Sequence, residues 1–203
     1  MNLSIGYTDL ILEECRKAKL SIPQTAYVLA TAYWETGRSM RPIKETVMPH
    51  HQNQSPPDSE VKRRLESAFA RGVLGNVRTP YWRDGWFGRG FVQLTHRANY
   101  ETASRHFGVG LLAKPEMAME PRLSAQIMIQ GMMGGWFGRR LTDFLNDTTK
   151  DYVNARRSVN GTDRAREIAS IAESYEKTLN KLPQPTQPKG ILAWLSAIFN
   201  RRA

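Results

Sequence analysis

The clearest helix signal in the chain is the stretch SIPQTAYVLATAYWETG, residues 21–37. Ser21 and Gln24 have the spacing of a capping box, and Pro23 suits the first turn of a helix. Gly37 is a typical stop signal, because glycine readily adopts the left-handed conformation that ends many helices. These signals predict a helix over 22–36 that places Glu35 in its last turn.

The chain on either side of this helix also favours helices. A second long helix is expected over 163–182, where apolar residues recur at helical spacing. Shorter helical patterns cover 9–20, 59–71, 97–107, 123–137 and 149–158. Alternating strand-like runs are scarce, and only 90–95 favours a short hairpin. We therefore expect a mainly α fold with at most a short β-hairpin.

The 203 residues are predicted to divide into three parts. A single folded body over 1–182 is long enough to bury one core. The stretch PQPTQPK, 183–189, has the composition of a stiff proline-rich linker. The remaining residues, 190–203, read GILAWLSAIFNRRA and form a tail of different character.

The tail over 190–203 is predicted to be an amphipathic helix, because its large apolar residues fall on one side of a helical wheel. Lys189, Arg201 and Arg202 make this end of the chain cationic. A bilayer takes about 20 apolar residues to span, so the tail is too short to cross one but suits the surface of an anionic membrane. The alternative is a helix docked on the body or on a dimer partner.

The charge is strongly positive, with 29 Lys and Arg against 19 Asp and Glu, a formal net charge of +10. Such a field attracts polyanions, so nucleic acid, anionic lipid and the acidic polymers of a bacterial envelope all qualify as partners. The basic residues are scattered among the predicted helices, and no known nucleic-acid-binding signature is present, which argues against nucleic acid. The excess can also serve solubility alone.

The single cysteine, Cys15, cannot form an internal disulfide and is expected to be a small buried hydrophobe. The N-terminus lacks the basic start and long apolar run of a signal peptide, so we expect synthesis to end in the cytoplasm. His50 and His51 have no Cys or acidic partner at ligand spacing, so no metal is expected. Gly88 and Gly90 lack the third glycine of a dinucleotide-binding motif, and no cofactor is expected.

Glu35 is the best candidate for acid catalysis. It is flanked by Tyr33 and Trp34 and lies in the last turn of its helix, where unpaired carbonyls make the potential negative. Both features penalise the carboxylate form, so we expect a carboxyl group that keeps its proton near neutral pH. A glycosidase needs such a group to protonate the departing sugar oxygen.

A second carboxylate follows at Glu45, after Gly37 and Pro42 have broken the helix. An inverting glycosidase separates its carboxyl groups by about 6.5 to 9.5 Å and a retaining one by about 5 to 5.5 Å, and the sequence does not choose between them. The alternative for Glu45 is a surface ion pair with Lys44 or Arg41.

The third candidate region is GWFGRGFVQLTHRANY, 85–100. Its glycines allow the backbone to approach a ligand closely, and Gln93, Thr95 and Asn99 offer donors and acceptors for sugar hydroxyl and acetamide groups. The aromatic residues Trp82, Trp86 and Phe87 are candidates for stacking against sugar rings.

Taken together, these motifs resemble those of family 19 glycoside hydrolases. The matching blocks, in the same order, are AYWETG at 32–37, Glu45, LGN at 74–76, GRGFVQLTHRANY at 88–100 and RRSVNG at 156–161. Over about residues 1–180 the chain is most similar to the compact phage and prophage endolysins of that group. It departs from the family pattern at 37–40 and at Thr162.

The resemblance implies a lysozyme-like, mainly helical catalytic domain over 1–182 and an inverting reaction. Glu35 would be the general acid, Glu45 the base that activates water, and Thr95 the hydroxyl that helps to hold that water. Gln93, Asn99 and Asn160 would bind the sugar chain, and Tyr100 and Arg157 would border the cleft.

Three functions remain open at this point. The first is a monomeric endolysin that reaches the cell wall and hydrolyses the β-1,4 bond between N-acetylmuramic acid and N-acetylglucosamine in peptidoglycan. The second is a chitinase of the same fold. The third is a non-enzymatic basic protein that binds membranes or nucleic acid.

Overall fold

The computed structural model describes residues 1–45, 55–75 and 77–182. The predicted linker over 183–189 and the tail helix over 190–203 lie outside the described residues, as do His50, His51 and Asn76. Within the described part the fold is mainly helical with one two-stranded sheet, as predicted. In chain order its elements are α1 (Thr8–Lys17), α2 (Ile22–Glu35), β1 (Ile43–Lys44), α3 (Asp58–Ala70), β2 (Arg89–Gly90), α4 (Arg97–Phe107), the 3-10 helix η1 (Pro115–Met119), α5 (Pro121–Gly134), the 3-10 helices η2 (Leu141–Asp143) and η3 (Asn154–Ser158), and α6 (Ala165–Leu179).

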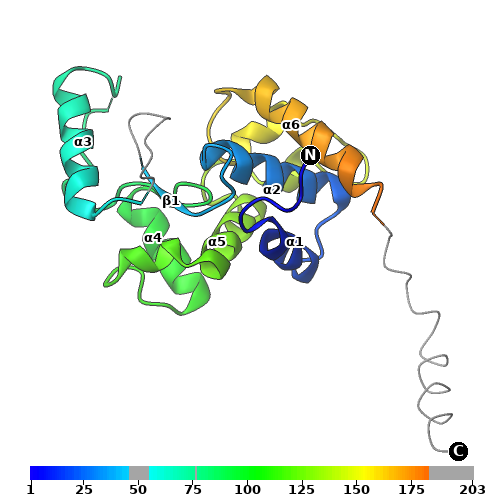
Figure 1. Ribbon diagram of the computed structural model, residues 1–203, viewed down its shortest axis with the longest axis horizontal. Coiled ribbons are helices and arrows are strands. Elements are labelled where there is room, and N and C mark those ends of the chain that lie inside the picture. The colour runs from blue at the N-terminus through cyan, green and yellow to red at the C-terminus, as the bar shows by residue number, and fades with distance from the viewer. Residues whose placement is uncertain (46–54, 76, 183–203) are drawn as a thin grey trace, which may run out of the picture.

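Helix α2 is the centre of the fold. Its capping box forms as predicted: the Ser21 hydroxyl accepts from the Gln24 N–H at 3.4 Å, and the Gln24 side chain accepts from the Ser21 N–H at 3.0 Å. Gly37 stands at φ +57° just beyond the last turn. Residues 24–32 are all buried, and α6 packs along α2 while α1 pairs with α5 (Figure 1).

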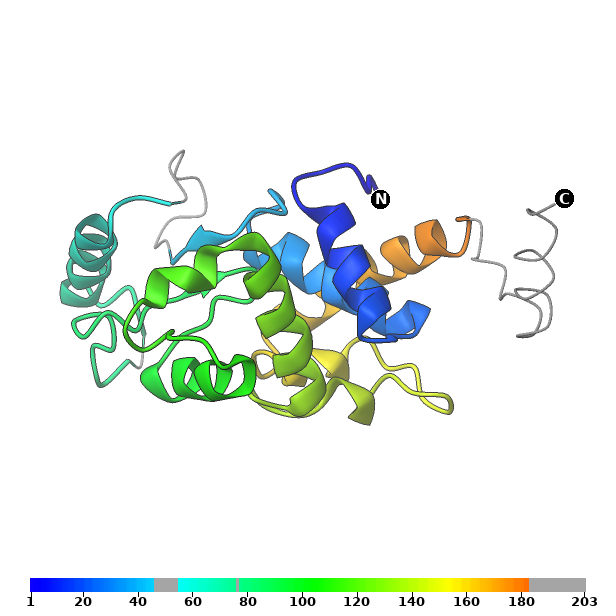
Figure 2. The same cartoon turned by 90° about the horizontal axis from the view of Figure 1, so that it is seen from below.

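The described part of the chain contains two separate hydrophobic clusters. The main core is formed by α1, α2, α4, α5 and α6 and includes Cys15, whose thiol pKa is raised by burial to about 12. The small core consists of Val61 and Leu65 of α3 together with Trp82 and Phe87. We call residues 55–75 and 77–88 the α3 lobe; α3 stands apart from the other helices at one end of the molecule (Figures 1 and 2).

The short sheet connects the α3 lobe to the main core. Strand β1 pairs antiparallel with β2, so that Ile43 faces Gly90 and Lys44 faces Arg89. Both cations bind Asp58 at the start of α3: Lys44 Nζ lies 2.7 Å from Oδ1, and Arg89 Nη2 lies 2.7 Å from Oδ2. Arg89 is itself buried, so the lobe is held by charged groups as well as by its small core.

The predicted hairpin over 90–95 forms one residue earlier, as a bridge in which Arg89 and Leu94 exchange two backbone hydrogen bonds of 3.2 and 2.9 Å. The pairing of β2 with β1 has no local signal in the sequence. Two 3-10 helices, η1 and η2, were not predicted either.

The prediction of a helix over 149–158 is wrong for its first half. Lys150 forms a bridge with Leu145, and only Asn154–Ser158 is helical, as η3. The physical reason is Asp151, whose carboxylate accepts hydrogen bonds from the backbone N–H of Asn154 at 2.9 Å and from its side chain at 2.7 Å. An aspartate that binds the backbone in this way delays the start of a helix.

The ends of other helices also differ from the prediction, most clearly in α5 and α6. Helix α5 begins at Pro121 rather than at 123, because the Glu120 carboxylate accepts hydrogen bonds from the N–H groups of Arg122 and Leu123. It ends at Gly134, before Gly135 at φ +73°. Helix α6 covers Ala165–Leu179 within the predicted 163–182. No helix in the described ranges has the length and hydropathy to cross a membrane.

Candidate active site

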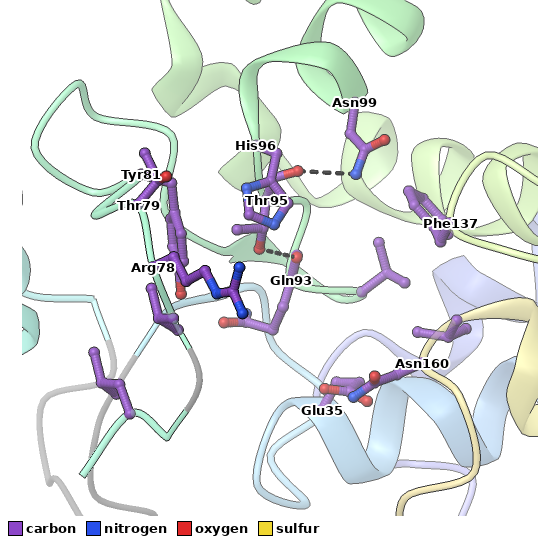
Figure 3. Close-up of a pocket in the computed structure, with 14 residues that line it drawn as sticks. Glu35, Arg78, Thr79, Tyr81, Gln93, Thr95, His96, Asn99, Phe137 and Asn160 are labelled. Atoms are coloured by element: carbon purple, nitrogen blue, oxygen red, sulfur yellow. Dashed lines mark hydrogen bonds between the residues drawn. The ribbon is translucent and has the colours of Figure 1, made fainter. Parts of the chain in front are cut away.

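A cleft of about 920 Å³ lies between the main core and the α3 lobe. One wall is formed by residues that belong to the main core or pack against it. The other wall is formed by residues that pack on the small core. Its lining residues are Glu35, Leu74, Val77, Arg78, Thr79, Tyr81, Val92, Gln93, Thr95, His96, Asn99, Phe137, Val159 and Asn160. Figure 3 shows Glu35 and Asn160 together on one side of this cleft and the turn with Gln93 and Thr95 between them and the α3 lobe.

Glu35 is the last residue of α2, and its side chain is 18% exposed. Its carboxylate Oε1 accepts a hydrogen bond of 2.7 Å from Nη1 of Arg156. The neighbouring Tyr33 and Trp34 pack on the main core, with the Tyr33 ring edge-on to Tyr175. The sequence predicts only groups that disfavour the charged carboxylate, whereas the structure adds a cation directly beside it.

Arg156 lies in η3 and is only 2% exposed. Its Nε donates to the carbonyl of Asp163 at 3.0 Å, and its own carbonyl accepts from the N–H of Asn160 at 2.9 Å. The same short segment therefore positions both the partner of Glu35 and the cleft residue Asn160.

The assignment of Arg157 to the edge of the cleft is wrong. Arg157 is exposed, its Nε donates to Asn154 at 3.3 Å, and it does not line the cleft. Its neighbour Arg156 is the arginine that reaches the site. The RRSVNG block pointed to the right segment but not to which of two adjacent side chains turns inward.

The turn between β2 and α4 presents a connected set of polar groups to the cleft. The Thr95 hydroxyl donates to the Gln93 carbonyl at 2.7 Å, and Asn99 Nδ2 donates to the Thr95 carbonyl at 2.9 Å (Figure 3). Gln93 stands at φ +54°, and its Nε2 donates to the carbonyls of Ile43 and Gly90. The turn is thus fixed by its own side chains rather than by regular secondary structure.

Gly88 permits this close arrangement. A Cβ atom at Gly88 would lie 2.8 Å from Oε1 of Gln93 and 3.2 Å from Oγ1 of Thr95. The 2.8 Å contact is shorter than Cβ atoms show in proteins and the 3.2 Å contact is tighter than most, so a larger residue would push Gln93 away and crowd Thr95. The sequence predicts that the glycines of 85–100 let the backbone approach a ligand. In the structure, Gly88 lets the backbone lie close to Gln93 and Thr95.

Glu45 is held just behind the cleft wall and is not among the lining residues. Its Oε1 accepts from the Tyr81 hydroxyl at 2.6 Å, and its Oε2 accepts from the Gly88 N–H at 2.8 Å. The alternative of a surface ion pair with Lys44 is wrong, because Lys44 binds Asp58. Burial and the adjacent Glu45 raise the pKa of Tyr81, so its phenol remains a hydrogen-bond donor.

Tyr100 does not border the cleft, which corrects the prediction. It is fully buried, and its hydroxyl donates to the Phe87 carbonyl and accepts from Nη1 of Arg89, both at 2.9 Å. Trp82 and Phe87 are likewise fully buried, in the small core, and cannot stack on a ligand. Trp86 is half-buried against Tyr100 and does not line the cleft.

Of the eight predicted site residues, the structure brings five into one cleft: Glu35, Gln93, Thr95, Asn99 and Asn160. The sequence prediction missed Arg156, Tyr81, Phe137, Arg78 and His96. A signal for Phe137 does exist, because the pentapeptide GWFGR occurs twice, at 85–89 and 135–139. Arg78 lies in a loop with no pattern that distinguishes it.

Among the described residues, no group of three or more His, Cys, Asp and Glu side chains is arranged to hold a metal ion. Comparison of the chain with models of known protein families gives no match, and a search among curated proteins gives none either. The function must therefore be argued from the site.

Proposed function

We propose that this protein is a glycoside hydrolase that cleaves the β-1,4 bond of bacterial peptidoglycan, with Glu35 as the general acid. The observation that carries the proposal is that Glu35 shares one cleft with Gln93, Thr95, Asn99 and Asn160. Cleft volumes of about 300 to 1,000 Å³ are typical of ligand sites, so this one has room for several sugar units.

The polar groups of the cleft match the hydrogen-bonding groups of an acetamido sugar. The side-chain nitrogens of Gln93 and Asn99 already donate to backbone carbonyls, which leaves the amide oxygens as acceptors. Thr95 also donates to the backbone and keeps lone pairs free to accept. Sugar hydroxyls and acetamide N–H groups are the donors that such acceptors bind.

Glu35 would protonate the glycosidic oxygen as the bond to the sugar breaks. The bond from Arg156 occupies Oε1 and leaves Oε2 to carry the proton. As the proton departs, negative charge develops on the carboxyl group next to the guanidinium. The attraction between Arg156 and the carboxyl group is then stronger in the transition state than in the ground state. This difference is the condition for an electrostatic contribution to the rate.

Glu45 would act as the base in an inverting reaction, with Thr95 helping to hold the water. Tyr81 and Gly88 donate to the two oxygens of Glu45, and this fixes the carboxylate with an unused lone pair on each oxygen. The test of this role is the anomeric form of the first product, which NMR distinguishes within the first minutes of a digest.

The experiment that separates the candidate functions is a parallel digest of purified peptidoglycan and of chitin oligosaccharides, with the new reducing ends identified by mass spectrometry. We expect N-acetylmuramic acid at the new reducing ends of peptidoglycan. Reducing ends from chitin alone would identify a chitinase. Absence of new reducing ends from both polymers would leave a non-enzymatic basic protein.

A further inference from the structure

Arg78 differs from the other cations of the α3 lobe. Each remaining lysine and arginine in the described part of the lobe donates to a described partner: Lys62 to the Arg83 carbonyl, Arg63 and Arg64 to Glu60, Arg71 to Ser67, and Arg83 to Glu66. Arg78 has no hydrogen bond or ion pair with any residue in the described ranges. Its charge is therefore not used to hold the lobe together.

Arg78 is also the lobe's only arginine or lysine among the residues that line the cleft. Its side chain is exposed, and Figure 3 shows the guanidinium extending from the lobe toward Gln93. Among the described residues that line the cleft, Glu35 is the only carboxylate, and Arg156 already neutralises it. Among the described lysine, arginine, aspartate and glutamate residues that line the cleft, Arg78 is therefore the one without a partner of opposite charge, and it lies on the wall that faces Glu35 from the α3 lobe.

A planar guanidinium in a cleft binds a carboxylate through two parallel hydrogen bonds. The neutral acceptors around Gln93 suit the sugar ring, so the carboxylate must come from a group attached to the sugar. Peptidoglycan carries such groups on its N-acetylmuramic acid units: carboxylates of the attached peptide or, on units without a peptide, the free lactyl carboxylate. Chitin carries none.

We propose that Arg78 binds a carboxylate borne by the muramic acid unit and so makes the cleft selective for peptidoglycan over uncharged polymers of the same sugars. This inference rests on the proposed function, because it assigns the substrate of that same cleft. Arg78 would then be a specificity-determining residue of the α3 lobe, opposite the wall that carries the proposed general acid Glu35.

The test compares Arg78→Gln with wild type and with Arg71→Gln. The control variant removes the same charge from the same lobe, but Arg71 does not line the cleft. The substrates are teichoic-acid-free peptidoglycan sacculi and the same sacculi with their carboxylates converted to amides by carbodiimide and ammonia. Release of reducing ends gives kcat/KM, and cosedimentation with the sacculi gives binding without any need for catalysis.

We expect Arg78→Gln to lower kcat/KM and binding on native sacculi roughly tenfold, the size of one charge-assisted contact, and Arg71→Gln to stay near wild type. On amidated sacculi Arg78→Gln and wild type should be equal. A third arm uses glycan strands stripped of peptides by an amidase, which hydrolyses the lactyl amide and so frees a lactyl carboxylate that the peptide-bearing units lack. A tenfold difference on these strands shows that Arg78 binds the lactyl carboxylate, and its loss there assigns the contact in native sacculi to the peptide.

Equal losses for Arg78→Gln on native and amidated sacculi would overturn the inference, since the effect would not depend on a carboxylate. So would unchanged binding and turnover on native sacculi. If wild type binds native sacculi through Arg78 but releases no reducing ends, the proposed hydrolase fails while the carboxylate contact stands.

Discussion

The two walls of the cleft are built in different ways. The wall that carries Glu35 is the end of a helix buried in the main core, and its key cation, Arg156, is almost fully buried. The α3 lobe rests on a hydrophobic cluster of four buried residues and on the ion pairs of Asp58. A rigid wall suits a group proposed to transfer a proton, because its position has to be accurate, whereas a lightly held wall could adjust to the proposed polymer.

The largest expected effects come from the same truncation in each core. Leu29→Ala in α2 and Leu65→Ala in α3 both remove a fully buried leucine. We expect a loss of about 4 kcal/mol in the free energy of global unfolding for Leu29→Ala, and of about 2 kcal/mol for Leu65→Ala because a small core collapses more easily around a cavity.

Hydrogen exchange distinguishes the two outcomes. Leu65→Ala should lose protection in α3 while α2 and α6 keep theirs, and Leu29→Ala should lower protection everywhere. A uniform loss of protection in Leu65→Ala would mean that the lobe and the main core unfold as one unit.

A smaller effect is expected at the turn that joins the two walls. Gly88→Ala should reduce kcat/KM on peptidoglycan about tenfold, because the added methyl group displaces Gln93 and crowds Thr95. Gly110→Ala is a matched control, since a Cβ there meets nothing within 4 Å. Kinetics on purified sacculi measure the change, and thermal melts check that both variants remain folded. Wild-type turnover by Gly88→Ala would show that the positions of these two side chains do not matter.

The smallest expected effect is on the stability of the α3 lobe at low pH. Partial burial raises the pKa of Asp58, but hydrogen bonds from Lys44 and Arg89 outweigh it and hold the pKa below its usual range. A group with a depressed pKa stabilises the fold above its unfolded value and loses that contribution as pH falls through the folded value. The lobe should therefore weaken below about pH 4.

Asp58→Asn should remove this acid sensitivity and reduce lobe stability at neutral pH by about 1 kcal/mol, since the Asp58 side chain is 41% exposed and solvent screens its ion pairs. NMR signals of α3, followed from pH 6 to 3 in both proteins, report the difference. Identical pH dependence in the two would contradict the role given to the Asp58 ion pairs.

Local signals predicted much of the fold. The capping box of Ser21 and Gln24, Gly37, and the periodicity of α6 each act over a few residues, and the structure contains the helices that they predict. The pairing of β1 with β2 depends on contacts between distant segments, which no local pattern encodes. Asp151 shows the limit of local signals: its carboxylate accepts two hydrogen bonds from Asn154, and the structure has a bridge and a short 3-10 helix where the sequence predicts one helix.

The site was predictable where a residue's position follows from its own element. Glu35 follows from the end of α2, and Gln93, Thr95 and Asn99 follow from one short turn. Which of Arg156 and Arg157 turns inward depends on the rotation of η3, and the burial of Tyr100 depends on Arg89. Such facts arise only when segments pack together.

In the proposed mechanism, the Glu35 carboxyl group transfers the proton that breaks a glycosidic bond. The direct measurement is the initial rate of reducing-end release from purified sacculi by wild type, Glu35→Gln and the control Glu101→Gln, whose residue is exposed on α4. Glutamine can still accept from Arg156 but has no acidic proton, so we expect a loss of about a thousandfold with folding intact and no loss in the control. A Glu35→Gln rate close to that of wild type would contradict the account.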